Sequence, residues 1–346
     1  MTLAISAWSA ISPFGYGRDA FADGVNGRTD TSAPVGPEWS VPDERACMVP
    51  DFDVRERLGN KGTRAMNRIS ALAVCTAGQL IADTEPDSRE ETGFVLGTTI
   101  GSAQSMMDFT RASLEAEKPF HVEPAKVPSC VMNCAAGQVA IWHQLRGPNA
   151  TVAAGRATGL MALNYARRLL LTGRARQVMC GAAEEYSHAR SWLDHHRRDE
   201  QDRAILGEGC AMLLLGTESS VRRPLATLRA VRSRVCLDDD PASTVLATVR
   251  RLLVEHDVDP AEVWAACGDE LTALRTVFGD EVVDRVPDME LIGDTSCASA
   301  LFQLTALLSV SATAPRSAGR FAVLSAVADD GAVACALIRL GEHDVR

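Results

Sequence analysis

The sequence predicts a layered α/β fold, because short apolar runs alternate with longer segments of helical periodicity along nearly the whole chain. The runs that favour strands are 2–8, 93–97, 149–154, 177–181, 210–216, 226–236, 262–267, 290–292, 321–327 and 332–340. The segments that favour helices are 62–83, 102–116, 130–143, 157–172, 242–256, 269–278 and 297–310. Strands that alternate with helices indicate sheets covered on both faces.

The order strand, small-residue turn and apolar helix occurs twice, at 150–172 and again at 290–310. This duplication predicts two pseudo-equivalent βαβ halves, which we place at residues 1–216 and 217–346, with the second half the shorter. The segments 28–60 and 186–204 are rich in proline or charge, and we expect surface caps and loops there.

Composition excludes several classes of function. The chain of 346 residues is 46% hydrophobic and 23% charged, which suits one large or two fused domains, and its net charge of -10 argues against nucleic-acid binding. The ten cysteines are scattered through apolar runs, as in a reducing compartment, so we expect a cytoplasmic protein without a membrane span or signal peptide. His195 and His196 beside Asp194 lack partners at ligand spacing, so we expect no metal and no cofactor.

The most informative residue is Arg156, in the segment Thr151–Leu160. The segment predicts a strand, a sharp turn and a helix, a unit that places one side chain at the N-terminus of a buried helix. The helix dipole and free N–H groups there would stabilise a thiolate or an oxyanion. A cysteine at this point would be an activated nucleophile, whereas a guanidinium cannot attack.

Five further segments repeat the motifs of a known family. They are the opening strand and SPFG turn at 4–17, a GTxxG-like loop at 97–101, an NMAAGxV-like helix at 131–139, an LGEGAGMLVL-like strand at 206–213 and a GHT-like triplet at 293–295. Together with the elbow at Arg156, they make the chain resemble the β-ketoacyl synthases of the thiolase-like fold over nearly its whole length. The resemblance implies a core of five layers, α/β/α/β/α.

The resemblance also implies a catalytic cysteine and two catalytic histidines, and none of the three is present. Arg156 stands at the cysteine position, Cys267 at that of the first histidine and Asp294 at that of the second. Met289 replaces a family lysine, and 327–331 replaces a glycine-rich loop. Claisen condensation needs a thiolate and two donors that stabilise the enolate. We therefore expect a catalytically silent chain.

Among degenerate relatives the chain most resembles the chain-length factors, or ketosynthase-β subunits, of type II polyketide synthases, although these usually carry glutamine where Arg156 stands. The resemblance implies a heterodimer with a catalytic ketosynthase subunit, which supplies the cysteine and most of the contact with an acyl carrier protein. This chain would then form the floor of the acyl tunnel. Adaptable apolar side chains suit that floor. The candidates are Met106, Met107, Phe109, Val131, Met132 and Cys134.

Two other interpretations remain open. The chain could be a non-catalytic homodimeric protein that binds acyl groups or docks a carrier. It could also be an acyltransferase with Cys267 or Cys297 as nucleophile, although neighbouring carboxylates raise a thiol pKa. Under the main interpretation, the side chain of Arg156 needs a carboxylate. We expect it to pair with Asp294 or, failing that, with Asp269 or Glu184, so that the ion pair fills the old acyl site.

Overall fold

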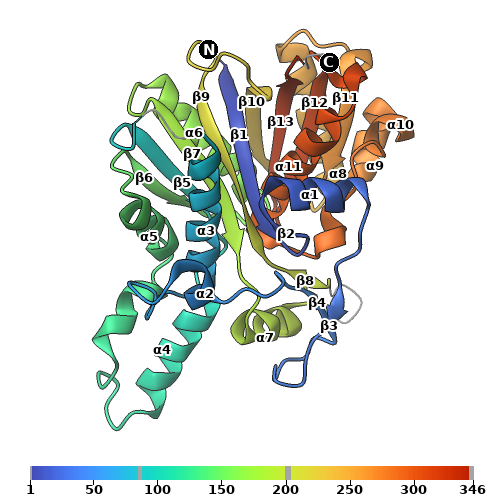
Figure 1. Cartoon of the computed structure of the whole chain (residues 1–346). Coiled ribbons are helices and arrows are strands. Elements are labelled where there is room, and N and C mark those ends of the chain that lie inside the picture. The colour runs from blue at the N-terminus through green and yellow to red at the C-terminus, as the bar shows by residue number, and fades with distance from the viewer. Residues whose placement is uncertain (1, 85–87, 199–203, 343–346) are drawn as a thin grey trace.

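The computed structural model describes residues 2–84, 88–198 and 204–342 (Figure 1). One large mixed sheet crosses the molecule in the order β11-β12-β13-β10-β1-β9-β7-β5-β6, and β2 pairs with β1. These strands are β1 (Leu3–Ser12), β2 (Gly15–Tyr16), β5 (Thr92–Gly97), β6 (Asn149–Val152), β7 (Gln177–Glu184), β9 (Gly209–Thr217), β10 (Ala226–Val235), β11 (Val263–Gly268), β12 (Phe321–Val327) and β13 (Ala332–Leu340). A second small sheet joins β3 (Ala33–Pro34), β4 (Arg45–Cys47) and β8 (Leu206–Gly207).

The helices form three layers, and the two halves of the sheet lie between these layers. α3 (Arg68–Thr84) and α5 (Cys134–His143) pack on the outer face of the half that contains β5 and β7. α6 (Thr158–Leu171) and α11 (Ser299–Ala312) lie between the two halves, and α8 (Pro241–Glu255) and α9 (Leu271–Phe278) cover the outer face of the half that contains β11 to β13. The five-layer α/β/α/β/α core expected from the sequence is confirmed.

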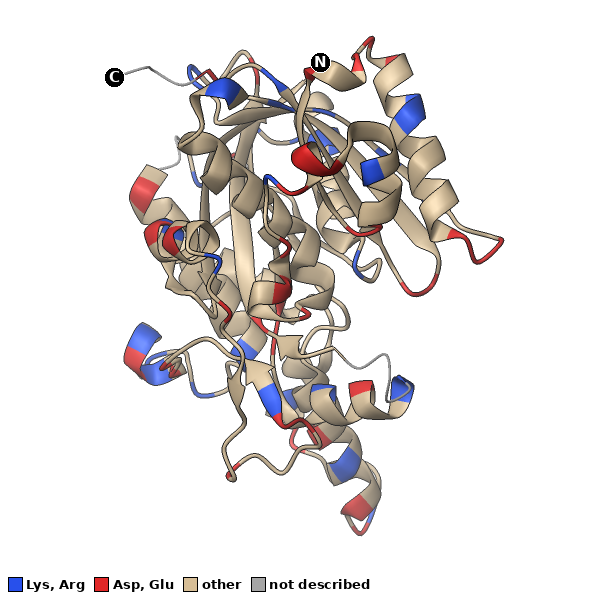
Figure 2. Cartoon of the chain, turned by 90° about the vertical axis from the view of Figure 1, so that its right-hand side faces the viewer, with Lys and Arg blue, Asp and Glu red and all other residues tan. Residues whose placement is uncertain are grey.

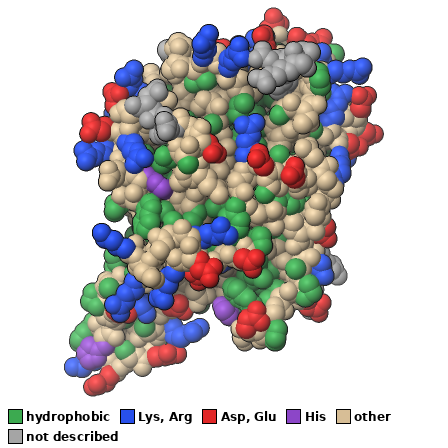
Figure 3. Space-filling view, viewed as in Figure 1, with side chains coloured by type: hydrophobic (Ala, Val, Ile, Leu, Met, Phe, Trp, Pro, Cys, Tyr) green, Lys and Arg blue, Asp and Glu red, His purple; other side chains and the backbone are tan. Residues whose placement is uncertain are grey.

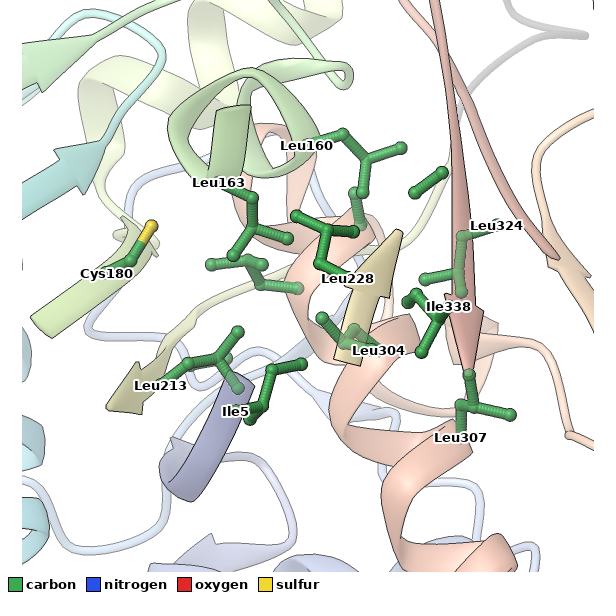
Figure 4. Close-up of a cluster of buried hydrophobic side chains, with 14 of the residues drawn as sticks. Ile5, Leu160, Leu163, Cys180, Leu213, Leu228, Leu304, Leu307, Leu324 and Ile338 are labelled. Atoms are coloured by element: carbon green, nitrogen blue, oxygen red, sulfur yellow. The ribbon is translucent and has the colours of Figure 1, made fainter. Parts of the chain in front are cut away.

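The middle layer holds the largest core cluster (Figure 4). Leu160 and Leu163 from α6 face Leu304 and Leu307 from α11, and side chains of β1, β9, β10, β12 and β13 complete the cluster. These four leucines are fully buried. Burying a leucine contributes roughly 1.5–3 kcal/mol, so this layer fixes the two halves against each other and with them the loops at the strand ends.

β1 is the central strand and is antiparallel to both of its long neighbours. Its pairing with β10 begins at Leu3 opposite Leu228, so β10 continues past the start of β1. On the other side, β5 is parallel to β6 and β7, with Gly97 opposite both Val152 and Ala182. The carboxyl ends of β5, β6 and β7 therefore meet at one edge of the sheet, where the elbow begins.

A projecting arm leaves the body below α3 and α5 (Figure 1). We use this name for residues 103–133, which comprise α4 (Ala103–Glu115), a loop and the 3-10 helix η1 (Pro124–Cys130). Ser102 caps α4 by accepting from the backbone N–H of Ser105. Among the residues of α4 only Ala103 is buried. The arm therefore presents most of its surface, apolar side chains included, to its surroundings.

Charged residues of both signs are distributed over the whole molecule, the arm included (Figure 2). No helix in the described ranges is both long enough and apolar enough to cross a bilayer. The described residues also contain no group of three or more His, Cys, Asp or Glu side chains arranged to hold a metal ion.

Two sequence predictions were wrong. The run 290–292 is no strand: it lies in the 3-10 helix η4 (Met289–Ile292), which the side chain of Asp288 caps and Gly293 ends. The second strand–turn–helix unit thus keeps its helix, α11, but not its strand. The segment 186–204, predicted as loop, contains the helix α7 (His188–Arg197), and residues 199–203 of it lie outside the described residues. The short helices α1 (Gly17–Asn26), α2 (Val54–Leu58) and α10 (Asp280–Val283) were not predicted either.

Candidate functional site

The elbow that carries Arg156 lies between the end of β6 and the start of α6. Gly155 has φ of +52°, and a Cβ there would come within 2.7 Å of the Cβ of Ala328, so the turn requires glycine. The hydroxyl of Thr158 closes the turn, because it accepts from the N–H of Ala154 (2.7 Å) and donates to the carbonyl of Gly155 (2.6 Å). This geometry directs Arg156 toward the loops that follow β11 and η4.

Arg156 binds two carboxylates there. Its Nη1 lies 2.5 Å from Oδ1 of Asp294, and its Nη2 lies 3.1 Å from Oδ1 of Asp269. The predicted meeting of Arg156 and Asp294 is confirmed, and Asp269, the second choice, binds at the same time. The third choice, Glu184, accepts instead from the hydroxyl of Thr99.

A second arginine completes what we call the arginine cluster, Arg156, Arg198, Asp269 and Asp294. Nη2 of Arg198 donates to Oδ2 of Asp294 at 2.7 Å, so the two oxygens of this carboxylate bind different arginines. The backbone N–H of Ser296 also donates to Asp294 Oδ1 (2.8 Å), and Arg190 of α7 donates to the Asp294 carbonyl (2.6 Å).

The electrostatics of the cluster favour the charged forms. Burial alone would raise the pKa of Asp294, whose side chain is 6% exposed, but Arg156, Arg190 and the hydrogen bonds from Ser296 and Arg198 lower that pKa to about 2. For Arg156, burial opposes the charge, but Asp269 and Asp294 outweigh it and raise the guanidinium pKa. Arg156 and Asp294 are therefore an ionised and mutually paired couple near neutral pH.

The two cysteines weighed as nucleophiles are unsuited to attack. Cys267 is 2% exposed and Cys297 is fully buried. Burial raises the pKa of Cys267 to about 12, and burial together with the charge of Glu184 raises the pKa of Cys297 well above its ordinary value. Cys267, placed by sequence at a lost histidine position, does not contact Arg156: Asp269, two residues further on, does.

A cavity of about 1000 Å³ opens beside the arginine cluster. Arg156, Arg198, Asp269 and Asp294 form part of its wall, but neither Cys267 nor Cys297 lines it, and no histidine or cysteine is present among the described residues that do. The described wall thus offers ion-paired groups beside apolar ones such as Ile205 and Leu291, and it contains no thiol and no imidazole. Its chemistry is that of ion pairing.

The predicted tunnel residues lie elsewhere, on the projecting arm and at the start of α5. Met106 and Met107 of α4 are 37% and 42% exposed, and Val131 and Met132 are 47% and 41% exposed. Phe109 and Cys134 are partly buried. A Cβ on Gly101 would lie 3.0 Å from the Cα of Met132, so the start of the arm and the segment before α5 are close together. None of the six belongs to the arginine cluster.

Sequence reasoning missed Arg190 and Arg198, because it left 186–204 without a helix. A usable signal was present: Ser187 directly precedes α7 and caps it, and Asp194 and Arg198 are spaced i,i+4, where they form an ion pair of 3.0 Å. Only the folded chain, however, brings Arg198 to Asp294, which is 96 residues further on.

Comparison with protein families identifies the family of the chain. Residues 9–220, more than half of the chain, match the family model of the β-ketoacyl synthase N-terminal domain. The chain belongs to the β-ketoacyl synthase family.

Among curated proteins, the chain is similar to 3-oxoacyl-[acyl-carrier-protein] synthase 2 of Vibrio harveyi, with 32% identity over 145 residues, which are 41% of this chain and 35% of that protein. A second relative, the synthase 2 of Rhizobium meliloti, is 30% identical over 196 residues, 52% of this chain and 46% of that protein. These matches span about half or less of the length of those relatives.

Among solved structures, the chain is similar to a chain of the ishigamide ketosynthase/chain length factor. That match has 42% identity and a TM-score of 0.95, and it covers 98% of this chain and 99% of the other. The resemblance to chain-length factors therefore extends over the whole chain.

Proposed function

We propose that this chain is a non-catalytic chain-length-factor subunit, which pairs with a catalytic β-ketoacyl synthase and contributes the floor of an acyl tunnel that limits product length. The observation that carries the proposal is the arginine cluster. Arg156 occupies the elbow position of a nucleophile, and both of its guanidinium nitrogens that face the loops bind carboxylates. An acyl thioester has no group to attack it here.

The pairing surface has two parts. β6 is an edge strand whose only neighbour among the described strands is β5, and an edge strand offers its free backbone N–H and C=O groups to another chain. Beside it, α5 and the projecting arm expose large apolar side chains (Figure 3). These are Leu114 (80%), Phe120 (72%), Val127 (45%) and Ile141 (81%), in addition to the exposed tunnel candidates. A protein partner would bury both parts together.

The position of the tunnel candidates supports the second half of the proposal. Met106, Met107, Val131 and Met132 lie on this same surface and are between 37% and 47% exposed. Side chains that line a tunnel shared with a partner must be open in the free subunit. Residues of a closed core, by contrast, would be inaccessible to the partner's acyl chain.

The proposal assigns the carrier protein mainly to the partner subunit, since the partner would hold the catalytic cysteine. The chain also shares its fold with a chain of the AntDE:AntF structure, in which a type II polyketide synthase acyl-carrier protein is bound to its ketosynthase. That match has 15% identity and a TM-score of 0.80 over 98% of this chain. At that identity only the fold is comparable.

Intact-mass measurement of the purified chain after incubation with acyl and malonyl carrier protein tests the proposal. We expect no covalent adduct, no decarboxylation and no condensation from the chain alone. Condensation should appear when a catalytic ketosynthase co-purifies with it, and should vanish when that partner's cysteine is replaced. A stoichiometric acyl adduct on this chain would favour the acyltransferase alternative. A stable homodimer that binds no ketosynthase would favour the homodimeric acyl-binding or carrier-docking protein.

A further inference from the structure

A basic cavity lies on the molecule far along the sheet from β6, where β10 runs past the beginning of β1. It measures about 380 Å³ and is lined by Thr2, Arg167, Arg229, Ala230, Arg232 and His256. Three arginines and one imidazole thus share one cavity, in a chain whose net charge is -10. Like charges are costly to bring together unless something of opposite charge occupies the space between them.

The fold brings these groups together from three elements. Arg167 lies on α6 in the middle layer, His256 is the C-cap of α8 in the outer layer, and β10 runs between these layers. β1 pairs with β10 only as far as Leu228, so the edge of β10 beyond that residue is uncovered on this side.

A β-bulge aims the arginines of β10 into the cavity. Leu228 pairs with Ile338 and Ala230 pairs with Leu337, so Arg229 is the extra residue between two consecutive rungs. In a regular strand, side chains three positions apart point to opposite faces. The extra residue of the bulge interrupts that alternation at Arg229. Arg229 and Arg232 therefore line the same cavity.

The polar groups of the cavity have capacity left for a ligand. No ion pair joins Arg167 or Arg229 to a carboxylate within the ranges 2–84, 88–198 and 204–342, whereas Arg232 binds Glu255 at 2.9 Å. Nε2 of His256 is a buried atom without a hydrogen-bond partner in the same ranges. A buried polar atom left unpaired costs about 1–3 kcal/mol, so it marks a place where a partner is missing.

We propose that this cavity binds the phosphoryl group of a small phosphorylated metabolite, with Arg167, Arg229 and Arg232 as charged donors and Nε2 of His256 as a fourth donor. Guanidinium groups bind phosphoryl oxygens through paired N–H bonds, and a dianion suits three converging arginines better than a single carboxylate does. The proposal is independent of the pairing with a ketosynthase, because none of these residues lies on β6, α5 or the projecting arm.

A second cavity indicates the rest of the ligand. It measures about 580 Å³, shares Thr2 and Arg229 with the first, and adds Thr217, Glu218 and Ser219. Hydroxyls and a carboxylate bind the hydroxyl groups of a sugar. The two cavities together therefore suit a sugar phosphate, with the phosphoryl group among the arginines and the sugar beside Glu218.

The protonation of His256 provides a readout specific to this site. Burial lowers the pKa of His256, Arg232 and Arg229 lower it further, and only Glu255 raises it. A bound phosphoryl group would oppose the two arginines and favour the charged imidazole. Occupancy should therefore raise the pKa of His256 and take up a proton.

Calorimetric titration of the full-length chain with inorganic phosphate, ribose 5-phosphate and unphosphorylated ribose tests the proposal. We expect saturable binding of both phosphates, tighter for ribose 5-phosphate, and none of ribose. Arg229→Gln and, independently, the exposed Arg232→Gln should each weaken binding roughly ten-fold or more. Arg234→Gln, on the same strand but outside both cavities, should leave it unchanged.

NMR titration of His256 with and without ribose 5-phosphate completes the test, and we expect the imidazole pKa to be higher with the ligand. Equal affinity for inorganic phosphate and ribose 5-phosphate would retain the phosphoryl site and overturn the sugar subsite. Absence of saturable binding by either phosphate would overturn the proposal. An equal loss of affinity in Arg229→Gln, Arg232→Gln and Arg234→Gln would also overturn it, because the binding would then be non-specific.

Discussion

The arginine cluster and the projecting arm differ in whether their side chains find partners within the chain. In the cluster, Asp294 is 6% exposed and each of its oxygens binds an arginine. On the arm, Leu114 is 80% exposed and Phe120 is 72% exposed. The charged groups of the first region are paired within one chain, whereas the apolar groups of the second are left uncovered by it. Under the proposed function, the lost chemistry and the retained interface therefore depend on different residues.

The sharpest test of this difference is a charge on the pairing surface. Ile141→Asp places a carboxylate at a position of α5 that is 81% exposed in the free chain. We expect the free chain to fold normally and the complex with the ketosynthase to weaken by about 4 kcal/mol, roughly a thousand-fold in Kd, because the charge would be desolvated.

Val254→Asp is the matched control, since Val254 is 82% exposed on α8, at the opposite side of the sheet. Analytical ultracentrifugation of each variant with the catalytic subunit measures the effect. If the two substitutions weakened the complex equally, the pairing surface would not differ from other exposed surfaces of the chain.

The next largest effect is expected at the arginine cluster itself. Arg156→Ala should lower the free energy of unfolding by about 2–4 kcal/mol, because it leaves Asp269 without its arginine and Asp294 with one of two. Arg156→Lys keeps the charge but not the fork that spans two carboxylates, so we expect an intermediate loss. Urea denaturation measures both, with Arg234→Ala as an exposed control. A loss in Arg156→Ala no larger than in the control would show that the cluster contributes nothing to stability.

The pKa of Asp294 predicts an acid sensitivity of smaller size. The pKa is lowered from 3.8 to about 2 in the folded chain, so the ionised form stabilises the fold at every pH above 3.8. That stabilisation, about 2 kcal/mol, is lost as the pH falls from 3.8 toward 2. Asp294→Asn should be less stable at neutral pH and should lack this part of the acid dependence. Unfolding curves of the two proteins that stay parallel down to pH 2 would contradict it.

The smallest effect on stability is expected on the arm. Met106→Ala, Met107→Ala and Met132→Ala should each change the free energy of unfolding by less than about 1 kcal/mol, because these side chains are already 37–42% exposed. The same substitutions, and Phe109→Ala, should lengthen the products made with the catalytic partner, and tryptophan at these positions should shorten them. Mass spectrometry of the products measures this. Unchanged product length together with a loss of about 2–5 kcal/mol would identify ordinary core residues.

Much of the fold was predictable because local patterns decide it. The predicted strands at 93–97 and 321–327 and the helix at 157–172 coincide with β5, β12 and α6 to within a residue. The prediction of a strand at 290–292 was wrong because three residues, of which only Leu291 and Ile292 are apolar, carry too little periodicity to distinguish a strand from a 3-10 turn. The pairing of Arg156 with Asp294 was predicted from the family resemblance, which places the two residues at catalytic positions that lie close together in active relatives.

By itself the sequence determined the α/β layers and the presence of an arginine at the elbow, since these depend on residue type and on spacing along the chain. Only the tertiary structure decided that Asp269 binds Arg156 at the same time as Asp294, that Arg198 shares Asp294, and that Cys267 lies outside the cluster. It also decided that Arg167, Arg229, Arg232 and His256 surround one cavity. These contacts join residues that are tens to more than a hundred positions apart. Their geometry arises from the packing of α6, α7, α8 and β10, which no local pattern specifies.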